Sequence, residues 1–209
     1  MTSLSTYWAH LSRAKHPEAS RNWPLLRACR CDCIRANRWR YDGTEMAAHR
    51  YEVKLHWTGN RGTGTSDYRA YGRDHQIAVA GKVAAIPGSS DPHFRGDRDR
   101  YNPEELLVAS LSACHMLSYL HLCAVNDVVV ISYEDEAVGT MTETPQGGGR
   151  FTCVTLRPRV GITSWSDAVK ATELHHQAHE LCFIANSVNF PVGCEAVIVA
   201  AESNRNPER

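Results

Sequence analysis

The most pronounced hydrophobic pattern in the chain is a long apolar run at residues 103–125, in which only two early glutamates are charged. Pro103 opens the run and suits the first turn of a helix, where its missing N–H forfeits no hydrogen bond. A helix that is apolar on every side is normally covered on every side. The run therefore predicts a core helix that stops at the Asn-Asp pair 126–127.

Alternation of apolar and polar positions predicts the strands that precede this helix. Y-E-V-K-L-H-W (51–57) alternates strictly, which indicates a half-buried strand. The glycine-rich segment 58–65 predicts a turn. Residues 68–72 and 75–80 predict two more short strands, and 81–101 predicts a surface loop.

The second half of the chain predicts strands, a second helix and a last strand. The hairpin signal T-P-Q-G-G-G separates two strands, and Ser164 or Ser166 can cap the helix. The predicted elements are strands at 128–143 and 151–162, a helix at 166–187 and a strand at 194–201, followed by a frayed tail. This order predicts an α+β fold with a mainly antiparallel sheet and two central helices.

Composition narrows the function classes. The 209 residues suit one domain, with or without a tail, and 23 basic residues balance 23 acidic ones. A net charge of zero favours neither nucleic acid nor a membrane surface as a partner. We see no run near the roughly 20 apolar residues that span a bilayer, and no secretory signal. We therefore expect a cytoplasmic protein whose eight cysteines are reduced thiols, some of them catalytic or metal-binding.

The first 45 residues differ from the rest. They carry eight basic and four acidic residues, a charge of +4, and have no sustained periodicity. We expect residues 1–45 to be a disordered basic tail or a mis-assigned extension before a true start at Met46, and 46–209 to be the domain. The C-R-C-D-C run at 29–33 is too tightly spaced for a standard zinc site.

Two helical segments carry the candidate chemistry. Cys114 lies within the apolar helix, where a cysteine is either a small buried hydrophobe or a reactive thiol. In the second helix His175, His179 and Cys182 fall at i, i+4 and i+7, which is one stripe. The stripe is an ordinary polar face, a second working thiol, or a zinc ligand set with Cys114 as the fourth ligand.

Three motifs in this order resemble the OsmC/Ohr family of organic hydroperoxide reductases. N-P-E-E-L-L-V-A-S-L-S-A-C (102–114) resembles the family signature N-P-E-x-L-x-x-A-x-x-x-A-C. G-N-R-G-T-G-T (59–65) resembles the turn with the catalytic arginine, and H-E-L-C-F-I-A-N-S (179–187) the second-cysteine segment. The resemblance covers about residues 50–202. It departs from the family where Phe183 and Ala185 replace the usual proline and serine after the second cysteine.

The resemblance implies an OsmC-like fold, an intertwined homodimer and a set of roles. It assigns Cys114 as the peroxidatic thiolate, Cys182 as the resolving cysteine, Arg61 as the partner of the thiolate and Glu104 as the carboxylate that holds Arg61. It implies an organic hydroperoxide as substrate, no bound cofactor or metal, and an external dithiol reductant of the lipoyl type.

Physical reasoning supports these roles. A cysteine attacks a peroxide as thiolate, burial in an apolar helix disfavours that form, and a guanidinium opposes the effect. Glu104 and Cys114 are ten residues apart on one unbroken helix, hence about 15 Å along its axis. Both can serve one site only if the carboxylate comes from a second subunit, so we expect an isologous dimer.

Two alternatives remain open at this point. One is a zinc-binding protein that uses Cys182, His179, His175 and Cys114. The other is an OsmC-like domain that has lost catalysis and binds a hydrophobic ligand, which Phe183 suggests. We interpret the other thiols, Cys123, Cys153 and Cys194, as packing residues and His115 as a core or interface histidine.

Overall fold

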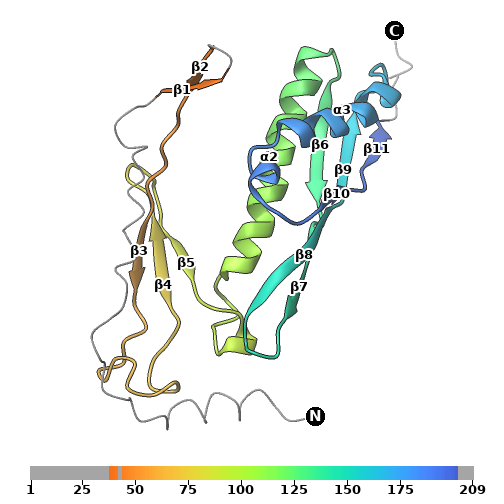
Figure 1. Cartoon of the computed structure of the whole chain (residues 1–209). Helices are drawn as coiled ribbons and strands as arrows, with labels where there is room; N and C mark the ends of the chain where they lie inside the picture. The colour runs from red at the N-terminus through yellow and green to blue at the C-terminus, as the bar shows by residue number, and fades with distance from the viewer. Residues whose placement is uncertain (1–37, 42–43, 202–209) are drawn as a thin grey trace. The chain divides into compact units, whose positions relative to one another are not determined.

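The computed structural model describes residues 38–41 and 44–201 (Figure 1). The chain divides into two units, Met1–Tyr51 and Glu52–Arg209. In the first unit, strands β1 (Arg38–Tyr41) and β2 (Thr44–Ala47) pair as an antiparallel hairpin. The C-R-C-D-C run, the rest of the expected basic tail and the C-terminal tail lie outside the described residues.

The second unit begins with a three-stranded antiparallel sheet in the order β3-β4-β5. Its strands are β3 (Lys54–Trp57), β4 (His75–Ala78) and β5 (Ile86–Gly88). The strands predicted at 51–57 and 75–80 are thus confirmed. The loop predicted at 81–101 is only partly right, because it contains β5 and the short 3-10 helix η2 (Pro92–Phe94).

The strand predicted at 68–72 is wrong, because that segment is a loop held by an arginine. The Arg73 guanidinium lies 4.3 Å from the ring centroid of Tyr68 and 4.1 Å from that of Tyr71. The same guanidinium donates hydrogen bonds to the carbonyl oxygens of both tyrosines. These contacts fold the segment back on Arg73 and keep it out of a strand ladder.

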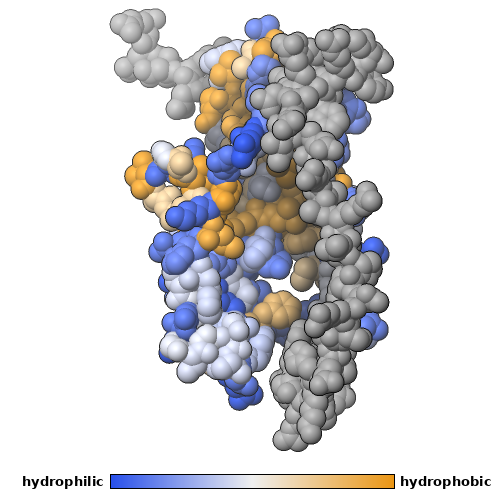
Figure 2. Space-filling view, turned by 60° about the vertical axis from the view of Figure 1, so that its left-hand side comes forward, coloured by the Kyte–Doolittle hydropathy of each residue, from blue (hydrophilic) through white to orange (hydrophobic). Residues whose placement is uncertain are grey.

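Strand β3 is not half-buried as its alternation predicts. All four of its residues are exposed, with Leu55 66% and Trp57 41% accessible. Ile86 on β5 is 41% accessible as well. Apolar residues also gather at the surface in the space-filling view (Figure 2). A sheet with this much exposed apolar area is suited to being covered by another surface.

The long helix α2 (Pro103–Val125) agrees with the prediction at both ends. Its N-terminus carries a reciprocal capping box. The Asn102 side chain accepts from the Glu105 N–H at 2.8 Å, and the Glu105 side chain accepts from the Asn102 N–H at 3.1 Å. One face of the helix is buried, whereas Leu117 and Val125 are more than 60% accessible. Coverage on every side is therefore not achieved by the described chain itself.

Helix α2 also corrects the expectation that no segment is long and apolar enough to span a bilayer. Its 23 residues and its hydropathy of 1.5 meet that requirement by length and composition. The core helix of a soluble protein meets the same requirement, so this finding is weak evidence for a membrane span.

The strands after α2 form two three-stranded sheets, in the orders β11-β9-β6 and β10-β8-β7. Pairs β6–β9 and β7–β8 are antiparallel, whereas β10–β8 and β11–β9 are parallel. The strand bounds are β6 (Val130–Asp135), β7 (Val138–Glu143), β8 (Gly149–Leu156), β9 (Pro158–Ile162), β10 (Val192–Cys194) and β11 (Val197–Ala200). The mainly antiparallel α+β fold is confirmed, with these parallel pairs as additions.

Each strand predicted in this half is broken into two at a common line. The breaks fall at 136–137, at Arg157 and at 195–196. The Arg157 N–H donates to Asp135 Oδ1 at 2.7 Å, and the Glu195 N–H donates to the Leu156 carbonyl at 2.8 Å. These bonds across neighbouring strands align the breaks, so all three strands pass together from one sheet into the other.

Helix α3 (Ala168–Leu181) is shorter than the predicted 166–187. Its N-cap is Asp167, which accepts from the N–H groups of Val169 and Lys170, rather than Ser164 or Ser166. Its C-cap is Cys182, and the 3-10 helix η3 (Ala185–Ser187) follows. Helices α2 and α3 pack together over β6, β9 and β11 (Figure 1), around a core of Tyr119, Leu122, Cys123, Val128, Val160, Ile162, Ala171, Leu174 and Ala178.

Candidate functional site

The structure brings together the two cysteines that the sequence singles out. Cys114 lies midway along α2 and is half-buried, and Cys182 ends α3 and is 1% accessible. The two side chains lie close enough for Cys114 to help raise the pKa of the Cys182 thiol, and both cysteines are free thiols. The packing of α3 against α2 therefore places one accessible sulfur next to one enclosed sulfur.

The surroundings of Cys182 favour its neutral form. Burial is the main cause that raises its pKa to about 11, and the neighbouring Cys114 side chain acts in the same direction. The Ala185 N–H donates to Cys182 Sγ at 3.4 Å, which partly opposes the rise. At neutral pH Cys182 is therefore a protonated thiol. Because Cys182 is also enclosed and Cys114 is only half-buried, Cys114 is the one of the two that an incoming molecule can reach.

The two departures from the family motif leave the Cys182 sulfur in place. The Phe183 side chain is 81% accessible, so it points away from the enclosed thiol. Ala185 contributes its backbone N–H, which any residue except proline supplies. The substitutions therefore change the surface beside the site rather than the contacts of the sulfur itself.

Arg61 and Glu104 do not join the cysteines within the described part of one chain. Arg61 is exposed on the turn after β3, where a guanidinium nitrogen lies 3.6 Å from the Cβ position that Gly72 would have. Glu104 is in the first turn of α2, ten residues before Cys114. Among the described residues no ion pair connects Arg61 with Glu104.

Glu104 instead lines an open cavity of about 720 Å³ between the first half of α2 and strands β6 and β7. The lining is apolar over much of its extent, with Val108, Met116, Val138 and Phe151 among its side chains. Polar groups at its edge include Ser112, whose hydroxyl donates to the Asp135 carboxylate. The cavity stops short of Cys114, which is not among its lining residues.

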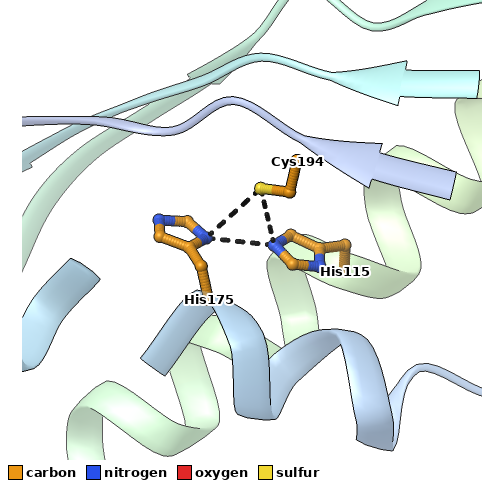
Figure 3. Close-up of side chains that lie close together, drawn as sticks. All are labelled: His115, His175 and Cys194. Atoms are coloured by element: carbon orange, nitrogen blue, oxygen red, sulfur yellow. Dashed lines mark hydrogen bonds between the residues drawn. The ribbon is translucent and has the colours of Figure 1, made fainter. Parts of the chain in front are cut away.

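A second cluster lies on the buried side of α2. His115 Nε2 is 3.0 Å from His175 Nδ1, and Cys194 Sγ is 3.7 Å and 3.9 Å from these two nitrogens (Figure 3). His115 is 1% and His175 5% accessible, and Cys194 is half-buried. His175 also stacks on the Tyr119 ring, with centroids 3.8 Å apart.

Burial sets the protonation of this cluster. It is the main cause that lowers the pKa of His115, and it lowers that of His175 to about 4. Burial, followed by the Asp135 charge, raises the pKa of the Cys194 thiol to about 11. At neutral pH the cluster therefore consists of two neutral imidazoles and one thiol.

The histidine stripe proposed from sequence does not form a ligand set. Of that stripe only His175 belongs to a group of donors within mutual reach, and its neighbours are His115 and Cys194 instead. The sequence predicts Cys194 as a packing residue and His115 as a core or interface histidine. The three residues lie 60 and 19 positions apart along the chain, so no local spacing signals them.

Comparisons with known proteins agree with the fold. The OsmC family profile, described as OsmC-like protein, matches residues 96–196. An OsmC-like protein of unknown function from Vibrio cholerae is 33% identical, with a TM-score of 0.66 over 72% of this chain and 100% of that one. No curated protein matches.

More distant structures share the fold. An organic hydroperoxide resistance protein OsmC from Legionella pneumophila is 17% identical, with a TM-score of 0.52 over 74% of this chain and 100% of that one. One from Elizabethkingia anophelis is also 17% identical, with a TM-score of 0.52 over 73% of this chain and 99% of that one. Taken with the Vibrio cholerae relative, the fold and the paired cysteines place this chain in the OsmC/Ohr family.

Proposed function

We propose that the protein is a thiol-dependent peroxidase that reduces organic hydroperoxides to alcohols. The observation that carries the proposal is the proximity of the half-buried Cys114 to the enclosed Cys182, whose pKa it helps to raise. Two thiols on neighbouring helices at this proximity can pass from dithiol to disulfide by a local rearrangement. Two fold relatives are named organic hydroperoxide resistance proteins, which agrees with this chemistry.

In the first step the Cys114 thiolate attacks the terminal oxygen of the hydroperoxide. An S–O bond forms, the O–O bond breaks, and the alkoxide that leaves takes up a proton to become the alcohol. Cys114 is thereby oxidised to a sulfenic acid. An apolar surface suits the organic group of such a substrate. Phe183, the exposed residue that follows Cys182, adds apolar surface to this part of the chain.

In the second step Cys182 resolves the sulfenic acid. Its sulfur attacks Cys114, an S–S bond forms, and the hydroxyl group leaves as water with the proton that the Cys182 thiol gives up. The protonated state of Cys182 at neutral pH supplies that proton. An external dithiol, which we propose to be of the lipoyl type, then reduces the disulfide by exchange and is itself oxidised.

Arg61 and Glu104 complete the site across a homodimer in this proposal. Helix α2 is continuous from Pro103 to Val125, so Glu104 and Cys114, ten positions apart, are separated by about 15 Å along the axis. A carboxylate from the partner can hold Arg61 beside Cys114 in a geometry that one chain does not offer. The bidentate pairing of guanidinium and carboxylate fixes the orientation of the arginine.

The proposal is tested by peroxidase assays with dihydrolipoamide as reductant. We expect turnover of cumene hydroperoxide to exceed that of hydrogen peroxide, and Cys114→Ser to reduce it to the uncatalysed rate. Cys182→Ser should retain one turnover and accumulate the Cys114 sulfenic acid. Cys153→Ser, a thiol in mid-strand β8, is the matched control and should keep full activity.

Mass spectrometry after one equivalent of peroxide gives a second readout. We expect a Cys114–Cys182 disulfide and no other. Both sulfurs still reduced, with no peroxide consumed, would instead favour an inactive OsmC-like domain that binds a hydrophobic ligand. The 720 Å³ apolar cavity beside α2 is the observation that supports this second candidate.

A further inference from the structure

The buried cluster of His115, His175 and Cys194 has no role in the peroxidase cycle. We propose that these three side chains form a mononuclear zinc site, with His115 Nε2, His175 Nδ1 and Cys194 Sγ as the protein ligands. The site is separate from the redox cysteines and is not required by the proposed peroxidase function. It would join α2, α3 and β10 at one point (Figure 3).

The distances between the donor atoms match those around a zinc ion. Zn–N bonds of about 2.0–2.1 Å and a Zn–S bond of about 2.3 Å at tetrahedral angles separate two nitrogens by about 3.3 Å, and nitrogen from sulfur by about 3.6 Å. The observed separations are 3.0, 3.7 and 3.9 Å. Shifts of a few tenths of an ångström would therefore bring all three donors to bonding distance of one ion.

The hydrogen bonding of the cluster does not explain why two histidines are buried there. The single contact between His115 and His175 leaves His115 Nδ1 and His175 Nε2 without a partner among the described residues. A buried polar atom left unpaired costs about 1–3 kcal/mol. A metal ion would bind the inner nitrogens and leave the two outer ones unpaired, but its bonds are stronger than the one hydrogen bond that the inner nitrogens share, and they offset the cost of burying both rings.

The charges favour a divalent ion. Zn²⁺ with one thiolate carries a charge of +1, and the Asp135 carboxylate acts electrostatically on both His115 and Cys194. With Asp135 counted, the site is neutral for Zn²⁺ but negative for Cu⁺. A site made of imidazole and thiolate ligands binds zinc in preference to magnesium or calcium, which favour oxygen ligands.

Three protein ligands leave a fourth position on the ion. Zinc sites of this kind hold water or an exchangeable ligand there. Cys194, the last residue of β10, is only half-buried, so that position is accessible from its side. The same ion would fix the spacing of the redox helices, since His115 follows Cys114 on α2 and His175 lies two turns before Cys182 on α3.

Zinc content per chain tests the proposal. The full chain is supplied with Zn²⁺, passed over a weak chelator and analysed by mass spectrometry of the metal. We expect one equivalent in the wild type and less than about a tenth of it in Cys194→Ser and His175→Phe, the latter of which keeps a flat ring on Tyr119. Matched controls on the same β-sheet and the same helix, Cys153→Ser and His176→Gln, should retain the full equivalent.

X-ray absorption at the zinc edge of the wild type needs no variant and so remains decisive where a variant fails to fold. We expect scattering from two nitrogen ligands and one sulfur ligand, and from an oxygen or nitrogen atom in the fourth ligand position. Two sulfurs would overturn the proposal. The proposal would also be overturned if Cys31→Ser, Cys114→Ser or Cys182→Ser lost zinc while Cys194→Ser kept the full equivalent. A preference of the cluster for Cu⁺ over Zn²⁺ would overturn it as well. Because metal content is measured without peroxide, failure here and failure of the peroxidase proposal are separate results.

Discussion

At the scale of single residues, the environment of Cys182 makes a prediction about pH. Burial raises its pKa to about 11, so at pH 8 only about one Cys182 in a thousand is the reactive thiolate. Alkylation of Cys182 by iodoacetamide should therefore be slow at pH 8 and rise steeply between pH 9 and 11. Peptide mass spectrometry after timed quenching measures this rate for Cys182 alone, with free glutathione in the same tube as the reference thiol.

The same shift affects stability with a defined sign. The unfolded chain loses the Cys182 proton near the ordinary thiol pKa, whereas the folded chain keeps it to about pH 11. The contribution of Cys182 to folding stability is thus complete below about pH 8.5 and is lost as the pH rises toward 11. Half-maximal alkylation of Cys182 near pH 8.5 in the folded protein would contradict both statements.

At the scale of elements, the turn between β3 and β4 depends on a close backbone contact. The Gly72 N–H donates to the Gly59 carbonyl at 2.8 Å, and a Cβ added at Gly59 would lie 2.0 Å from the Gly72 carbonyl oxygen. We expect Gly59→Ala to lower the free energy of unfolding by about 1–3 kcal/mol, because the added Cβ has no room beside the Gly72 carbonyl. Its urea midpoint should fall, and amide exchange in β3 and β4 should accelerate.

A matched alanine substitution separates this clash from a general effect of losing a glycine. Gly148 lies in the β7–β8 hairpin, where an added Cβ would meet its nearest neighbour, Thr144 Oγ1, at 3.5 Å. Gly148→Ala should therefore change the free energy of unfolding by less than about 0.5 kcal/mol and leave the urea midpoint nearly unchanged. Equal midpoints for the two variants would show that the contact at Gly59 is not as tight as described.

Elements set by local signals could be predicted from the sequence, and those set by distant contacts could not. Helix α2 is predicted at both ends because Pro103, the apolar run and the Asn-Asp pair at 126–127 are all local signals. The breaks in the later strands were missed because Arg157 bonds to Asp135, 22 positions away. Cys114 and Cys182 were predicted through the family motifs, whereas the His115 cluster joins distant segments that no motif connects.

At the scale of the whole molecule, the exposed apolar surface requires an explanation. Leu117, at the middle of α2, is 63% accessible, and Leu55 on β3 is 66% accessible. Burying a leucine side chain contributes about 1.5–3 kcal/mol, so leaving several of them in water is unfavourable. A homodimer through these surfaces would cover them, and it would also bring Glu104 of one chain to Arg61 and Cys114 in the site that we propose.

A charge on this surface tests the dimer and the shared site together. We expect the wild type to have twice the chain mass of 23.3 kDa in solution, and Leu117→Lys to weaken the dimer at least tenfold, since a buried unpaired ammonium is strongly unfavourable. Val169→Lys, 69% accessible on α3, is the control of similar exposure and should stay dimeric. Light scattering gives the mass, and the peroxidase rate measured across a dilution series should fall in parallel with the dimer fraction of Leu117→Lys. If that variant becomes monomeric and keeps its full rate, one chain holds a complete site, and the contribution of Glu104 from the partner is wrong.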